Sequence, residues 1–195
     1  MNQRLSRIAP LFLVLPLYLA GCGAAPTEIE GTWLKACVAS SGTSTKTTLT
    51  NTGDTGVLAG ESFSDAACTT LAATTTVTST FTLGAAVDSP AGAKKMDSTL
   101  VSITITPKTD AMVTTLNTGS YCSVTNWAKD TATDVTGKVC SGGVTYFAKG
   151  AVTYTLYKLE GSSLTLGTTT GLGPDDGTTE AGRHTALDSV SYTKQ

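Results

Sequence analysis

This sequence has little charge and almost no histidine. Charged residues make up 14% of its 195 residues, and His184 is the only histidine. It has no lysine-arginine cluster, which argues against nucleic acid as a partner. Its cysteines lack C-x-x-C spacing, which together with the single histidine argues against a metal site. No long segment with helical periodicity and no repeat of 20–50 residues is visible.

Threonine is abundant instead. It is β-branched and favours the pleated surface of strands. A chain with low charge that is rich in Thr, Ser and Gly is typical of an all-β protein. Regularly spaced Val, Ile, Leu, Phe and Tyr argue against disorder. We therefore expect one ordered all-β domain.

The first 22 residues have the pattern of an export signal. Arg4 and Arg7 precede an apolar run, residues 8–19, which two prolines interrupt and which is too short to span a bilayer. The run leads to Leu19-Ala20-Gly21-Cys22, which resembles a bacterial lipobox. The resemblance implies that residues 1–21 are a lipoprotein signal peptide and that Cys22 carries acyl chains such as palmitate. An ordinary secretory signal with a chance cysteine is the alternative.

A lipidated Cys22 would anchor the protein to a membrane. Several acyl chains anchor almost permanently, because each buried methylene contributes about 0.8 kcal/mol. Residue 23 is Gly rather than Asp, and by resemblance to lipoprotein sorting this implies the outer membrane. Residues 22–28 would form the tether, with the domain facing the periplasm or the cell surface. Removing residues 1–21 lowers the basic count from 13 to 11 against 15 acidic residues, so the net charge becomes −4.

The other four cysteines are Cys37, Cys68, Cys122 and Cys140. An exported protein meets an oxidising compartment, where an even set of cysteines usually pairs. Three pairings are possible. We expect Cys37–Cys68 and Cys122–Cys140, because each joins neighbouring segments, and each bridge would stabilise the fold by about 3–4 kcal/mol in the chain-entropy model.

Period-two alternation predicts a series of short strands. They are expected at residues 31–38, 45–51, 56–63, 75–84, 100–107, 112–117, 156–159, 164–166 and 189–194. In residues 75–84, Val77, Phe81 and Leu83 share one face, and threonines occupy the other. In residues 100–107, the same pattern puts Val101, Ile103 and Ile105 together. Residues 121–143 are less regular, and residues 167–182 are predicted to be a loop.

Eight to ten short strands in one meander predict either an antiparallel up-and-down β-barrel of about eight strands or a β-sandwich. An integral outer-membrane barrel is a third option. It fits less well, because girdles of aromatic residues are absent and a lipid anchor would be redundant.

Gly31-Thr32-Trp33 favours the barrel. It resembles the G-x-W motif of the lipocalin (calycin) superfamily, and the chain resembles small bacterial outer-membrane lipoproteins with a lipocalin-like domain. The resemblance covers residues 29–195 as a single domain and is carried by the two ends of that range. It implies that Trp33 closes one barrel end, with a basic residue, Arg183, packed across its ring.

Residues that could carry chemistry have simpler interpretations. His184 lies four residues before Asp188, but the chain lacks a G-x-S-x-G motif, and a surface histidine is the favoured interpretation. Asp175, Asp176 and Glu180 miss the spacing of calcium loops and are expected in an exposed turn. Four aromatic residues could line a cavity, form a contact patch or pack in the core: Tyr121, Trp127, Tyr146 and Tyr154.

The sequence therefore predicts a lipid-anchored envelope protein that binds a small apolar or amphipathic ligand inside its barrel. The ligand-binding residues are not identifiable at this stage. The alternative is a surface module that binds a protein or glycan through its loops. We expect no enzymatic activity, no catalytic residues, no cofactor and no metal.

Overall fold

The computed structural model describes residues 27–170 and 175–195. In chain order the strands are β1 (Gly31–Ser40), β2 (Thr43–Thr52), β3 (Thr55–Phe63), β4 (Leu71–Ala86), β5 (Lys94–Pro107), β6 (Thr133–Asp134), β7 (Val152–Glu160), β8 (Ser163–Thr168), β9 (Ala186–Leu187) and β10 (Tyr192–Lys194). The helical segments are α1 (Asp110–Thr118), η1 (Tyr121–Ser123) and η2 (Ser141–Gly143). The helices of this part of the chain are all too short or too polar to cross a bilayer.

Eight of these strands form a closed antiparallel barrel. Sequential neighbours pair from β1 through β5, β5 pairs with β7 and β7 with β8, and β10 closes the ring between β8 and β1. The expected all-β barrel of about eight strands is confirmed, and its meander topology is consistent with a lipocalin-like barrel. The sandwich alternative is wrong, because a sandwich would leave two separate sheets.

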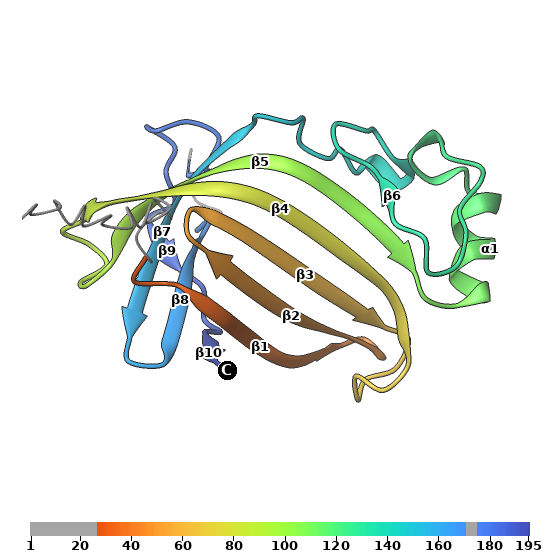
Figure 1. Cartoon of the computed structure of the whole chain (residues 1–195), viewed down its shortest axis with the longest axis horizontal. Helices are drawn as coiled ribbons and strands as arrows, with labels where there is room; N and C mark the ends of the chain where they lie inside the picture. Colours follow the sequence, from red (N-terminus) through yellow and green to blue (C-terminus); the bar gives the residue numbers. More distant parts are fainter. Residues whose placement is uncertain (1–26, 171–174) are drawn as a thin grey trace, which may run out of the picture.

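The barrel is built from long and short strands, so its two ends differ. Figure 1 shows β1 to β5 as a broad curved sheet that β7 and β8 cross at one end only. Strand β7 pairs with Lys94–Thr99 of β5, and β10 pairs with β1 at Trp33 and Leu34. We call the end closed by β7, β8 and β10 the narrow end and the opposite one the wide end.

Alternation places apolar side chains inside and threonines outside, as expected. Val77 and Phe81 face the interior, whereas Thr80 and Thr82 are exposed on the outer face of β4. One position of the inward face that we expected for β5 is wrong. Ser79 pairs with Leu100 and Thr78 with Ser102, which makes Val101 the extra residue of a β-bulge. Leu100 therefore takes the inward position that we expected for Val101.

The long connection between β5 and β7, residues 108–151, is called the insertion below. The sequence predicts a strand at residues 112–117, but this segment is helix α1. The Thr109 hydroxyl accepts a hydrogen bond from the Met112 amide at 3.1 Å, capping the helix, and Leu116 is buried beneath it. Tertiary packing of one apolar face thus overrides the strand preference of its threonines and valine.

The insertion builds a second core at the wide end. Its buried side chains pack against inward-facing residues of β5, including Leu100, Ile103 and Ile105. The insertion contributes Leu116, Cys122, Trp127, Val135 and Cys140. Core packing is therefore the correct interpretation for Trp127 and for Tyr121 and Tyr146, which pack against this cluster.

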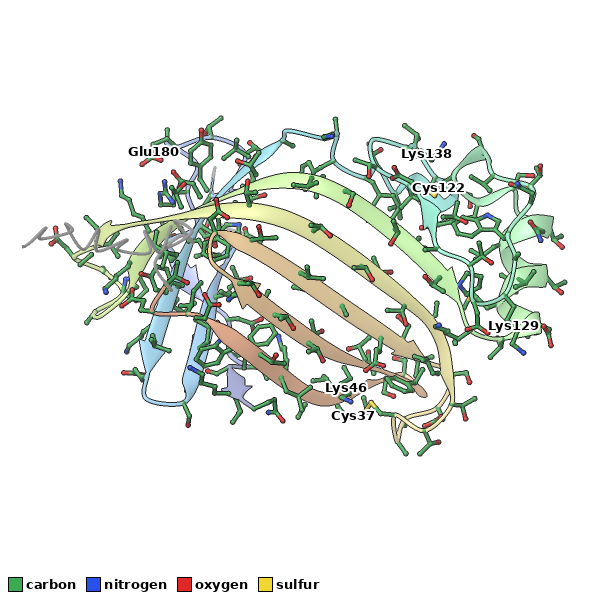
Figure 2. All side chains as sticks on the ribbon, in the orientation of Figure 1. Cys37, Lys46, Cys122, Lys129, Lys138 and Glu180 are labelled. Carbon is green, nitrogen blue, oxygen red and sulfur yellow. A yellow bond between two sulfur atoms is a disulfide. The ribbon has the colours of Figure 1, made fainter. Side chains whose placement is uncertain are left out.

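Both expected disulfides are present. Cys37–Cys68 joins β1 to the connection between β3 and β4, and Cys122–Cys140 closes a loop within the insertion. Figure 2 shows Cys37 beside the end of β1 and Cys122 in the insertion, so the bridges fix separate parts of the structure.

Candidate ligand-binding site

The narrow end is filled by a hydrophobic cluster around Trp33. The Trp33 side chain is 0% exposed, and its neighbours in the cluster include Ile29, Tyr157, Leu164 and Tyr192. The indole N–H donates to the Ile29 carbonyl at 2.8 Å, so the one polar atom of the ring has a partner. Trp33 therefore forms part of the floor of the barrel interior.

The basic residue over Trp33 is Lys194, and the expectation for Arg183 is wrong. The Lys194 ammonium lies 5.2 Å from the centre of the indole ring, because Lys194 pairs directly with Trp33 across β10 and β1. Gly31 has φ +114°, and a Cβ there would lie 3.3 Å from Lys194 Cε. Glycine at position 31 thus lets the chain turn into the barrel and leaves room for the lysine stem.

Arg183 instead fastens a late segment to the outside of the barrel. Its guanidinium lies 5.3 Å from the Tyr154 ring centre and donates to the carbonyls of Met96 (3.2 Å) and Thr155 (2.8 Å). It also pairs with Asp97 at 2.6 Å and contacts Glu180. Burial lowers the pKa of Arg183, but the hydrogen bonds to both carboxylates outweigh it and leave the pKa raised.

Between the two cores lies a cavity of about 350 Å³. Most of its wall is apolar, contributed by side chains of β2 to β5, β8 and the insertion. These are Leu49, Leu58, Val77, Phe81, Met96, Leu100, Ile103, Leu166, Phe147 and Ala151, with Ile29 from the segment before β1. Phe147 is 56% exposed although it lines the cavity, which places it at the rim. The cavity is large enough to hold one small organic molecule.

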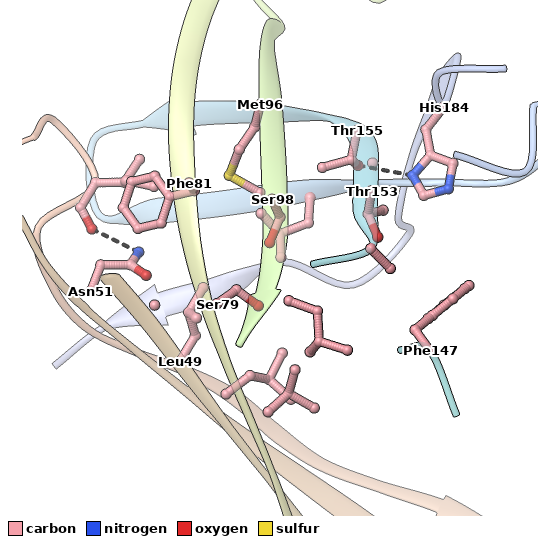
Figure 3. A pocket seen from close by; sticks show the side chains of 18 of the residues that line it. Leu49, Asn51, Ser79, Phe81, Met96, Ser98, Phe147, Thr153, Thr155 and His184 are labelled. Carbon is pink, nitrogen blue, oxygen red and sulfur yellow. Dashed lines mark hydrogen bonds between the residues drawn. The ribbon is translucent and has the colours of Figure 1, made fainter. Parts of the chain in front are cut away.

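Polar side chains reach the cavity at a few positions. Figure 3 shows Asn51 and Phe81 on one side, Thr155 and His184 on the other, and Ser79 and Ser98 between them. The Asn51 amide donates to the Ile29 carbonyl at 3.0 Å. The Thr155 hydroxyl and His184 Nδ1 are 2.8 Å apart. These two contacts fix side chains of the wall.

His184 is half-buried and lines the cavity. Its backbone N–H donates to the carbonyl of Tyr154 in β7, and this bond holds the segment around His184 beside that strand. Asp188 pairs with Lys35 at 2.7 Å and not with His184. In the described part of the chain, the side chain of His184 makes its hydrogen bond with Thr155. The expected surface histidine keeps part of its exposure, but it also forms part of the cavity wall. Its position beside β7 depends on pairing between distant segments, which the local sequence does not reveal.

The acidic residues near 175–180 hold the segment that covers this wall. Asp175 is only 6% exposed, and its carboxylate accepts from the Thr170 amide (2.8 Å) and the Thr185 hydroxyl (3.2 Å). These bonds lower its pKa, first of all the one from Thr170. The exposed turn expected here is thus wrong for Asp175, which ties the two ends of the segment together. Among residues 27–170 and 175–195, no three His, Cys, Asp or Glu side chains cluster as metal ligands would.

The segment just before β1 is tied to the narrow end by Glu28. Its carboxylate accepts a hydrogen bond from the Tyr157 hydroxyl and pairs with Lys94 at 2.9 Å. These two contacts, Tyr157 first, lower the pKa of Glu28. Burial and the same contact raise the pKa of Tyr157. Cys22, the expected lipidation site, lies outside the described residues.

The fold and site together define a closed β-barrel with an internal, mostly apolar cavity. Comparison with known proteins finds no family model that matches the sequence and no significantly similar curated protein.

Proposed function

We propose that this chain is a lipid-anchored protein of the outer membrane that binds a small apolar or amphipathic molecule non-covalently inside its barrel. The cavity carries the proposal, because a filled interior would leave no room for a ligand. Its volume of about 350 Å³ and its apolar walls suit a single small molecule. The lipocalin-like motif Gly31-Thr32-Trp33 and the lipobox ending at Cys22 support the family and the anchor.

Native mass spectrometry of the chain exposed to a bacterial lipid extract tests the binding. We expect an added mass on the wild type. Leu58 and Val57 are neighbours on β3, and only Leu58 lines the cavity, whereas Val57 is exposed. Leu58→Trp should fill the cavity and remove the added mass, while Val57→Trp should keep it. Absence of any added mass, or equal binding by both variants, would argue against a ligand in the barrel.

A surface-interaction role is the second candidate, and one observation favours it. Three exposed large apolar side chains occur within residues 139–147 of the insertion: Val139, Val144 and Phe147. Such a group is typical of a contact surface. If this role is correct, binding of a protein or glycan partner should fall in Val139→Ser and Val144→Ser but not in Leu58→Trp. Loss of binding in Leu58→Trp but not in Val139→Ser or Val144→Ser would instead support binding inside the cavity.

A further inference from the structure

Three hydroxyl groups form a polar row across the cavity wall. Ser98 of β5 pairs directly with Thr153 of β7. Ser79 of β4 pairs with Leu100, which lies one inward position beyond Ser98 on the same strand. All three side chains line the cavity. Side chains on one face of adjacent strands lie about 5–8 Å apart, so one polar group of a ligand can reach more than one of these hydroxyls.

These hydroxyls differ from the other polar groups of the wall. Asn51 and Thr155 already have protein partners at the cavity. Within the described residues, the hydroxyls of Ser79, Ser98 and Thr153 have no hydrogen-bond partner in the protein. A hydroxyl facing an apolar space needs a partner, from water or from a ligand. A ligand that displaces the water without replacing its hydrogen bonds loses affinity.

No Lys, Arg, Asp or Glu side chain of the described residues lines the cavity, and His184 is the one ionisable side chain among its described lining residues. Arg183 is a buried cation next to this wall, and it donates to the carbonyls of Met96 and Thr155, two residues of the wall. Asp97 and Glu180 neutralise it there. An ionised ligand group would therefore be desolvated in the cavity without a carboxylate, ammonium or guanidinium partner there.

We propose that the cavity selects an uncharged amphipathic ligand whose hydrogen-bonding group sits at Ser79, Ser98 and Thr153. The apolar part of the ligand then packs against Leu58, Val77 and Phe81. This inference rests on the proposed function, because it names the ligand class of the same cavity. It excludes fatty-acid anions and alkylammonium ions, which have similar apolar parts but carry charge.

Four probes with matched chains test the selectivity: decanamide, undecane, decanoate and decyltrimethylammonium. Each is titrated at pH 7 into the delipidated full chain, below the concentration at which it forms micelles. We expect decanamide to bind about ten-fold more tightly than undecane, as one or two neutral hydrogen bonds imply. We expect decanoate and decyltrimethylammonium to bind still more weakly than undecane.

Variants then assign the selectivity to the hydroxyl row. Ser98→Ala and Thr153→Val should each weaken decanamide binding about three- to ten-fold and leave undecane binding unchanged. Ser102→Ala is the matched control, because Ser102 lies on the same strand and does not line the cavity. Ser98→Thr keeps a hydroxyl and should retain the preference for decanamide, which separates lost hydrogen bonding from disturbed packing.

The outcomes distinguish the two levels of the proposal. If decanoate or undecane binds as tightly as decanamide, or if Ser98→Ala and Thr153→Val leave decanamide binding unchanged, the ligand class is wrong and the binding function stands. If none of the four probes binds and the lipid extract gives no added mass, the binding function fails and the ligand class with it.

Discussion

Gly31 and Lys194 are the residues on which the narrow end depends most visibly. Gly31 has a positive φ and lies against the lysine stem, and Lys194 covers the indole of Trp33. A motif of glycine and tryptophan two positions apart thus has a physical basis here: the glycine shapes the turn into the barrel, and the tryptophan fills its end.

Gly31→Ala should destabilise the fold by about 1–3 kcal/mol, because alanine is strained at φ +114° and its methyl group would press on Lys194 Cε. Gly42→Ala is the control, since Gly42 also has a positive φ (+84°) but has no atom within 4 Å of the added methyl group. Urea unfolding measures both. A loss in Gly31→Ala no larger than in Gly42→Ala would show that the contact with Lys194 is unimportant.

Trp33→Ala should destabilise the fold by about 3–5 kcal/mol, because it empties the centre of a packed cluster. Lys194→Ala should cost only about 0.5–1 kcal/mol, as expected for a cation–π contact at an exposed position. Thermal and urea unfolding compare the two. Equal losses would mean that the lysine stem, and not the indole, closes the narrow end.

Asp65 makes stability depend on pH. Burial raises the pKa of its carboxyl, but hydrogen bonds from the amides of Thr69, Thr70 and Ala67 outweigh it and leave the pKa well below its usual value. A carboxyl whose pKa is lowered by folding stabilises the fold above its unfolded pKa, about 3.9, and this contribution is lost as the pH falls further. The wild type should therefore lose more stability between pH 7 and pH 2.5 than Asp65→Asn.

Unfolding by urea at each pH measures this difference. Asp88→Asn is the control, because Asp88 makes no side-chain hydrogen bond or ion pair in the described part of the chain, and its pH dependence should follow the wild type. A parallel pH dependence of Asp65→Asn and the wild type would contradict the assignment.

The residue-level expectations failed where contacts depend on pairing between distant segments. The sequence places a basic residue near its end, but Arg183 and Lys194 both satisfy that description. Which one meets Trp33 is decided by the pairing of β10 with β1. The sequence did contain a feature that favours Lys194: it lies within the last predicted strand, and the first and last strands of a closed meander must pair.

Among the elements, the strands were predictable and their exceptions were not. Alternation between Thr and Val, Ile, Leu or Phe is a local signal, and it predicts the inner and outer faces of β4. The bulge at Val101 depends on the partner strand, so the local sequence misassigns one face position of β5. Helix α1 had local signals that alternation obscured: a capping Thr109 and the spacing of Met112 and Leu116.

The cavity residues were predictable only in part. Val77 and Phe81 were expected on an inward face, but the hydroxyl row at Ser79, Ser98 and Thr153 was not. Serine and threonine are so common in this sequence that single inward-facing examples carry no local signal. These hydroxyls become a candidate binding feature only because strand pairing brings them next to one another.

Removing the disulfide of the insertion should loosen that element and leave the rest of the barrel intact. Replacing Cys122 and Cys140 with alanine removes about 3 kcal/mol of stabilisation in the chain-entropy model for a separation of 18 residues. Hydrogen exchange should accelerate at the amides of Val135 and Gly137, which bond to Ile103 and Phe147.

The matched control replaces Cys37 and Cys68 with alanine. This bridge joins β1 to a connection at another part of the wide end, so exchange should accelerate there and not in the insertion. Native-state hydrogen exchange read by mass spectrometry measures both variants. Equal acceleration throughout the chain in both variants would show that the insertion and the barrel open as one unit.

For the whole molecule, the position of the narrow end gives an orientation relative to a proposed lipid anchor. Cys22 is eleven residues from Trp33, so the tether spans at most ~36 Å. If Cys22 is acylated, we propose that the narrow end faces the bilayer and the wide end points to the aqueous side. Ligands would then arrive from solution and not directly from lipid.

A tether lengthened by a Gly-Ser segment after Cys22 should therefore leave ligand binding on vesicles unchanged within about two-fold, because the wide end already faces water. Binding to vesicle-anchored protein measures this, with Cys22→Ser as the unanchored control. A large gain or loss on lengthening would mean that the cavity exchanges its ligand with the membrane. A mass spectrum of the mature N-terminus without acyl chains would remove the anchor itself.

Closure of the ring has a consequence for the order in which the protein folds. Strand β10 joins β1 to β8 through a few residue pairs near the C-terminal end of the described chain. Until those residues dock, β1 and β8 both keep an unsatisfied edge at the narrow end. The curved sheet and the insertion are held by contacts among earlier residues, whereas Trp33 acquires Lys194 and Tyr192 only when β10 docks. The end of the barrel that carries the Gly31-Thr32-Trp33 motif is thus complete only when strand β10 has docked.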